Sequence, residues 1–88
     1  MRPERLEDMK NIGPAMAHWL RSAGISSPQT VRDLGAVECY LRIRTLHKHA
    51  ANRMALYALY GAIHNRNCLW LPSEIKQMLN DMLEDTAS

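Results

Sequence analysis

Signals for the start and end of helices divide this sequence into short segments. They are Gly13-Pro14, Gly24, Ser27-Pro28, Gly35 and Pro72. A glycine often ends a helix in the left-handed conformation, whereas a proline is favoured at the first helical position. Between these signals apolar residues recur with helical spacing, and no segment alternates as a strand does. The 88 residues therefore predict one all-α domain, a bundle of about five helices.

The apolar spacing also predicts where the helices lie. Helices are expected over residues 15–23, 36–46, 50–64 and 72–83, with shorter helical turns over 4–9 and 28–34. The last helix carries a methionine-rich apolar stripe, which we expect to pack on the core. The stripe consists of Ile75, Met78, Leu79, Met82 and Leu83. Trp19 is expected in the core and Trp70 wedged under the last helix, whereas residues 84–88 are expected to fray.

The stretch from Leu6 to Ile25 resembles a helix-hairpin-helix motif, whose usual form is apolar-x-Gly-apolar-Gly-x-x-x-Ala. In that resemblance Ile12 plugs between two helices, Gly13 lets the backbone turn, and Ala17 permits a close helix crossing. The first glycine of the motif is replaced by Asn11, a residue type that tolerates a left-handed turn. The sequence thus predicts a hairpin turn over residues 11–14.

Such a turn into a helix favours anion binding. The first amides of a helix lack intrahelical partners, and the helix dipole adds partial positive charge there. A nucleic-acid phosphate can accept their hydrogen bonds without any base being read. The residues expected at this site are Lys10, Asn11, Gly13, Ala15 and Met16. Ala15 stands where DNA-binding members often carry Lys or Arg, so a hairpin that only joins helices or docks a protein is an equal alternative.

The charge distribution is uneven along the chain. Residues 1–38 are neutral, residues 39–73 hold five Lys/Arg and no acid, and residues 74–88 carry a net charge of −3. We expect a basic surface that binds the backbone of DNA or RNA. Its residues would be Arg42, Lys48, His49 and Arg53. The alternative is that helix packing scatters these cations around the surface.

Several classes of function are not expected from this sequence. Its cysteines and histidines match no zinc spacing, so we expect no metal and no cofactor. Neither a catalytic motif nor a small-molecule site is recognised, so an enzyme is not expected. We expect no membrane span, because no long apolar run is present, and no signal peptide, because the first residues lack an apolar stretch. The two cysteines, Cys39 and Cys68, fit reduced thiols in a cytoplasmic protein.

A pattern that spans nearly the whole chain resembles the C-terminal domain of the TfoX/Sxy family of competence regulators. The matching residues are Asn11–Pro14, Ala17, Trp19-Leu20, Ala23–Ile25, Val31, Asp33–Glu38, Tyr40, Leu56, Ala58-Leu59, Gly61-Ala62 and Trp70–Pro72. The resemblance implies a SAM-like bundle with an N-terminal helix-hairpin-helix over residues 1–88, as a free-standing copy of that domain. It also implies a regulatory or nucleic-acid-linked role.

Two functional hypotheses follow from the sequence. The first is a non-enzymatic module that holds nucleic-acid backbone phosphates through the hairpin and the basic surface, with a role in transcription or competence. The second is a protein-interaction domain, including a homodimer, that binds no nucleic acid.

Overall fold

The computed structural model describes residues 4–48 and 52–87 of the chain, with side chains described as far as Asp85. The elements follow in the order η1 (Leu6–Asp8), α1 (Pro14–Ser22), α2 (Pro28–Leu34), α3 (Ala36–Leu46), α4 (Arg53–His64), η2 (Cys68–Trp70) and α5 (Ser73–Ala87), where η is a 3₁₀ helix. The described residues contain no strand, which confirms the all-α class. No helix among them is long and apolar enough to cross a membrane.

The helix ends follow the expected local signals. Gly24 is left-handed with φ +80°, and the amide of Ile25 returns to the Leu20 carbonyl at 2.9 Å, which closes α1. Ser27 caps α2 by accepting the amide of Thr30 through its hydroxyl. These contacts confirm the predicted boundary between the helix expected over residues 15–23 and the helical turn expected over residues 28–34.

The boundaries of α4 are also set by asparagines. Asn52 caps its start by accepting the Ala55 amide at 3.0 Å, so the helix begins at Arg53 rather than at residue 50. Residues 50 and 51 lie outside the described part of the chain. At the other end Asn65 adopts the left-handed conformation with φ +55° and stops the helix.

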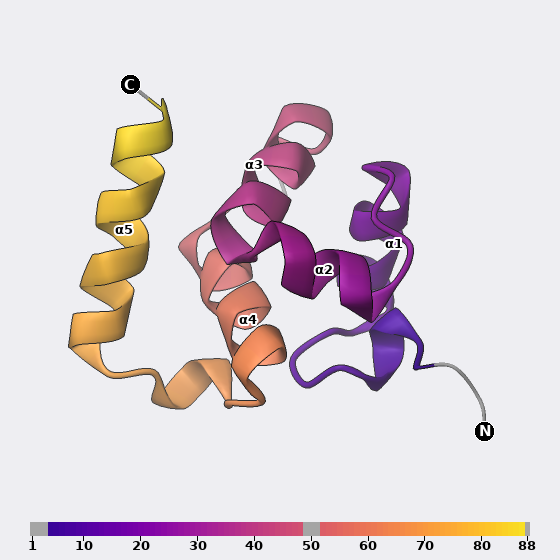
Figure 1. The fold of residues 1–88 in the computed structure, drawn as a ribbon, viewed down its shortest axis with the longest axis horizontal. Coiled ribbons are helices and arrows are strands. Elements are labelled where there is room, and N and C mark those ends of the chain that lie inside the picture. Colours follow the sequence, from indigo (N-terminus) through magenta and orange to yellow (C-terminus); the bar gives the residue numbers. More distant parts are fainter. Residues whose placement is uncertain (1–3, 49–51, 88) are drawn as a thin grey trace.

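The core lies where α3 and α4 cross, with α1 and α2 on one side and α5 on the other (Figure 1). Its fully buried large side chains come from almost every element. They are Leu6, Leu20, Ile25, Val31, Cys39, Ile43, Leu56, Leu59 and Leu79. Burial of an aliphatic side chain contributes about 1.5–3 kcal/mol, so these residues carry most of the packing energy. The arrangement is consistent with the expected SAM-like bundle.

The first helix of the expected hairpin is shorter than the motif requires. Leu6 and Met9 are buried as anchors, but only Leu6–Asp8 form a helix, and it is a single 3₁₀ turn. A segment this short has too few residues for an α-helical hydrogen-bond ladder. The turn over residues 11–14 and the helix after it are present, whereas the two-helix hairpin is not confirmed.

The region before α5 differs from expectation. Trp70 does not wedge under the last helix, because its side chain is 80% exposed and Leu71 is buried instead. Since Trp70 ends the 3₁₀ turn and Leu71 continues in an extended conformation, neighbouring side chains point apart, and only Leu71 reaches the core.

The helix α5 begins at Ser73, one residue after Pro72, and continues to Ala87. The expected fraying of residues 84–88 stays a prediction, and residue 88 lies outside the described part of the chain. Leu79 and Leu83 of its apolar stripe are buried and Ile75 is half-buried. Met78 and Met82 remain 41% and 46% exposed, so the stripe is wider than the contact it makes with the core.

Candidate functional site

The hairpin turn is open to solvent at the start of α1. Ile12 is buried as a plug, whereas Gly13, Pro14 and Ala15 are exposed. No described residue accepts a hydrogen bond from the amides of Gly13, Ala15 or Met16. The amides of Gly13 and Ala15 are therefore free donors on exposed residues, whereas the amide of Met16 is a free donor on a buried residue. This geometry can receive an anionic oxygen.

The side chain of Asn11 fastens the turn to the end of α4 and to the start of η2. Its Nδ2 donates to the carbonyl of Arg66 at 2.7 Å and to that of Ala58 at 3.4 Å. Its Oδ1 accepts the amide of Cys68 at 3.3 Å. The residue adopts the left-handed conformation with φ +70°, as the substitution for glycine predicts. Asn11 therefore acts as a clip between segments more than 40 residues apart.

Gly61 makes room for this clip. A Cβ atom built at Gly61 would collide with the Arg66 carbonyl oxygen and with Asn11 Nδ2. The amide of Arg66 also donates to the Gly61 carbonyl at 2.7 Å. Only a residue without a side chain permits the turn after α4 to approach the hairpin this closely.

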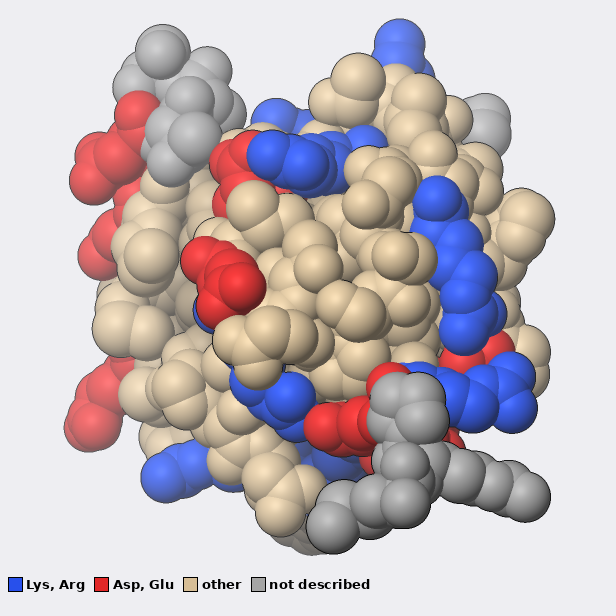
Figure 2. Space-filling view, turned by 45° about the vertical axis from the view of Figure 1, so that its right-hand side comes forward, with Lys and Arg blue, Asp and Glu red and all other residues tan. Residues whose placement is uncertain are grey.

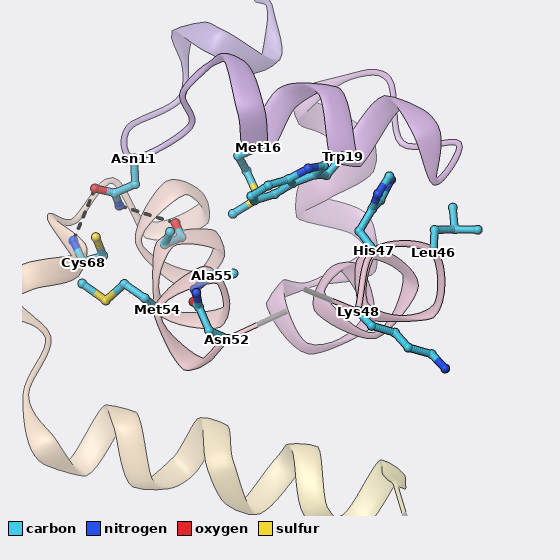
Figure 3. Close-up of a pocket in the computed structure, with 11 residues that line it drawn as sticks. Asn11, Met16, Trp19, Leu46, His47, Lys48, Asn52, Met54, Ala55 and Cys68 are labelled. Atoms are coloured by element: carbon cyan, nitrogen blue, oxygen red, sulfur yellow. Dashed lines mark hydrogen bonds between the residues drawn. The ribbon is translucent and has the colours of Figure 1, made fainter. Parts of the chain in front are cut away.

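A groove of about 720 Å³ extends from the hairpin turn to the end of α3 (Figure 3). Trp19 and Met16 of α1 form one wall, and the start of α4 forms the other. Asn11 and Cys68 lie at one end, whereas His47 and Lys48 lie at the opposite end. The complete lining is Asn11, Met16, Trp19, Leu46, His47, Lys48, Asn52, Met54, Ala55, Ala58 and Cys68. It contains no acidic residue.

Trp19 is a wall of this groove rather than a core residue. It is half-buried, and its ring centroid lies 6.5 Å from that of His47. The Nε2 atom of His47 is buried without a hydrogen-bond partner among the described residues. Trp19 thus packs against the core from one side and faces the groove on the other.

Four cations flank the groove without an acidic partner among the described residues. Lys10 precedes Asn11, Lys48 lines the groove, Arg53 lies between two lining residues, and Arg66 is held through its carbonyl by Asn11. All four are exposed. Lys48 points away from the groove into solvent (Figure 3). Residues with unpaired cationic side chains therefore occur near both ends of the groove.

Other arginines in the described part of the chain are neutralised locally. Arg5 and Arg21 pair with Glu7, Arg32 pairs with Glu4, and Arg42 pairs with Glu38. Arg44 lies over the Tyr40 ring at 5.8 Å instead. Basic and acidic side chains consequently stand next to one another on the face shown in Figure 2.

The bidentate pair between Arg21 and Glu7 braces η1 against α1. Its two N–O distances are 2.8 and 2.7 Å. The hydrogen bonds from Arg21 are the main reason that the pKa of Glu7 falls from 4.5 to about 2. In the core, burial raises the pKa of the Cys39 thiol to about 11. Neither group faces the groove, so both are structural.

The structure brings together only part of the predicted site. Of the predicted residues, Asn11, Met16 and Lys48 line the groove. Lys10, Gly13, Ala15 and Arg53 do not line it but are neighbours of lining residues in the sequence. Arg42 does not line the groove and is ion-paired. His49 lies outside the described residues.

Arg66 is absent from the predicted phosphate-binding residues, although its position in the acid-free segment 39–73 indicates a cation without a nearby acidic residue in the sequence. Its proximity to the hairpin depends on a contact across 55 residues, which local patterns do not reveal.

The opposite side of the molecule is acidic. Acidic side chains follow α5 along the left edge of Figure 2. On this helix a shallow second groove is lined by Ser73, Glu74, Gln77, Met78, Asp81, Met82 and Asp85. Within residues 4–48 and 52–87, no three His, Cys, Asp or Glu side chains gather as metal ligands.

Two solved structures share this fold. An uncharacterised protein from Listeria monocytogenes, in a triclinic crystal form, is 28% identical and superimposes with a TM-score of 0.85 over 97% of this chain and 96% of its own. A protein of unknown function from Listeria monocytogenes, in a tetragonal form, is 31% identical, with a TM-score of 0.76 over 91% of this chain and 98% of its own. None of the curated proteins compared matches this chain.

The family comparison agrees with the resemblance found in the sequence. The family model described as the TfoX C-terminal domain matches residues 2–83, which is nearly the whole chain. The match includes the hairpin turn, the Asn11 clip and both walls of the groove. The chain belongs to the TfoX C-terminal domain family.

Proposed function

We propose that this chain is a non-enzymatic module that holds the phosphate backbone of nucleic acid at the turn into α1. The observation that carries the proposal is the set of amides at Gly13, Ala15 and Met16 that have no acceptor among the described residues. A phosphate oxygen can accept two such hydrogen bonds, and charge-assisted bonds of this kind are stronger than neutral ones.

The surrounding cations support the same role. Lys10, Lys48, Arg53 and Arg66 are exposed and unpaired around a groove without acids. Because Ala15 carries no cation of its own, the backbone amides fix the phosphate and these four side chains supply the attraction. Contacts of this kind position a strand without reading its sequence.

The salt dependence of duplex DNA binding tests the proposal. If each of the four cations neutralises one phosphate, affinity falls about 150-fold between 50 and 200 mM salt, from a slope of about −3.6. The double variant Lys48→Gln/Arg66→Gln should reduce that fall to about 12-fold. Fluorescence anisotropy with a labelled duplex measures both.

A matched control removes the same charge elsewhere. Arg5→Gln/Arg32→Gln deletes two arginines that are paired with Glu7 and Glu4. This variant should keep the wild-type salt slope. No binding of the wild-type protein at low salt, or an equal loss of slope in both double variants, would refute the proposal.

A protein-interaction function is the second candidate, and exposed Met78 and Met82 on α5 favour it. Flexible methionines suit adaptable contacts. If this face holds a second copy of the chain, sedimentation equilibrium should detect a dimer that Met78→Gln/Met82→Gln weakens. A strictly monomeric wild-type protein contradicts self-association. A regulatory role in competence remains a prediction from the family.

A further inference from the structure

The most exposed aromatic side chain lies next to the hairpin turn. Trp70 is 80% exposed and the adjacent Leu69 is 66% exposed, both on the 3₁₀ turn η2. An exposed tryptophan gives up a large hydrophobic contribution and commonly marks a binding surface. No described ring or cation contacts Trp70.

The turn that carries Trp70 is firmly held. Asn67 accepts the Leu69 amide through Oδ1 at 2.9 Å, and the Trp70 amide donates to the Asn67 carbonyl at 3.0 Å. The Cys68 amide donates to Asn11 Oδ1 at 3.3 Å, which joins this turn to the hairpin. The carbonyl of Arg66 accepts a hydrogen bond from the same asparagine, so the backbone of Arg66 lies close to the hairpin turn as well as to η2.

The distance between these features can be spanned by a short nucleic-acid strand. Trp70 is two positions after Cys68 and Gly13 is two positions after Asn11, so the backbones of Trp70 and Gly13 lie within about 20 Å of each other. At the rise of about 3.4 Å per nucleotide of a duplex strand, about six nucleotides cover this span, and a more extended single strand needs fewer. An exposed tryptophan on a firmly held turn, close to amides that can bind phosphate, is an arrangement suited to stacking on unpaired bases.

We propose that Trp70 stacks on an unpaired base of a strand whose backbone is held at the hairpin turn and by Arg66, so that the module prefers single-stranded over duplex nucleic acid. This inference rests on the proposed function and names its substrate class. A base in a duplex is covered on both faces, so duplex DNA would use the hairpin and the cations without Trp70.

The test compares a 12-nucleotide single strand with an abasic strand of the same length, which keeps the phosphates and removes the bases. Trp70→Ala should weaken binding of the base-bearing strand about 5- to 150-fold, the range for loss of one base–aromatic stack. The abasic strand should bind both proteins equally. Met78→Ala, which truncates an exposed apolar side chain on α5, is the matched control and should change neither affinity.

A spectroscopic signal reports the contact directly. In the Trp19→Phe background Trp70 is the remaining tryptophan of the chain. Its emission should be quenched by the base-bearing strand and unchanged by the abasic strand.

The outcomes separate the two proposals. If neither strand nor duplex DNA binds at low salt, the proposed function fails and this inference fails with it. If the strands bind with equal affinity and Trp70→Ala has no effect, phosphate binding stands and base stacking is overturned. If Trp70→Ala weakens the abasic strand equally, Trp70 supports the fold of the site and does not stack.

Discussion

Replacing Asn11 with alanine should test the clip that joins the hairpin to the end of α4. The change removes two donated hydrogen bonds and one accepted bond, which together contribute roughly 1–3 kcal/mol. It also places alanine at φ +70°, which costs about 1 kcal/mol more. We therefore expect the free energy of unfolding to fall by about 2–4 kcal/mol and the Tm by about 8–30 °C.

Urea unfolding followed by circular dichroism measures this loss, and Asn65→Ala is the matched control. Asn65 is also left-handed, with φ +55°, but no hydrogen bond of its side chain is seen among the described residues. Asn65→Ala should therefore cost only the conformational part, about 1 kcal/mol. Equal losses in the two variants would show that the side-chain bonds of Asn11 contribute nothing, which would refute the clip.

Three further predictions concern other parts of the fold. Gly61→Ala should lower stability by roughly 1–3 kcal/mol, measured by thermal unfolding, because the added carbon displaces the clip; an unchanged Tm would contradict this. Because the pKa of Glu7 is lowered in the folded state, its pair with Arg21 stabilises the fold above about pH 4.5 and the stabilisation is lost as pH falls towards 2. The stability difference between wild type and Glu7→Gln should thus vanish in acid, and a constant difference would count against the pair. A thiol reagent should modify half-buried Cys68 in the native protein but reach Cys39 only on unfolding, because burial raises the pKa of Cys39; modification of both thiols at one rate would be inconsistent with the buried position.

Local signals predicted the helices well because each depends on a few neighbouring residues. The left-handed Gly24 and the capping Ser27 lie where the sequence places them. The free amides of the hairpin are likewise predictable from local sequence. Gly13-Pro14 marks the start of a helix, and the first amides of a helix have no intrahelical partner.

The rest of the site depends on contacts between distant segments. No local pattern places Arg66 beside the hairpin, because Asn11 reaches it across 55 residues. The exposure of Trp70 was missed because a three-residue turn has no periodicity, so which of Trp70 and Leu71 faces the core is settled by packing alone. The wall position of Trp19 likewise depends on where α3 ends.

The central claim is that free amides at the start of α1 receive a phosphate, and an NMR titration tests it most directly. Duplex DNA added to ¹⁵N-labelled protein at low salt should shift the amide resonances of Gly13, Ala15 and Met16 first, and added salt should reverse the shifts. Shifts confined to α2 or α5, or none at all, would contradict the account.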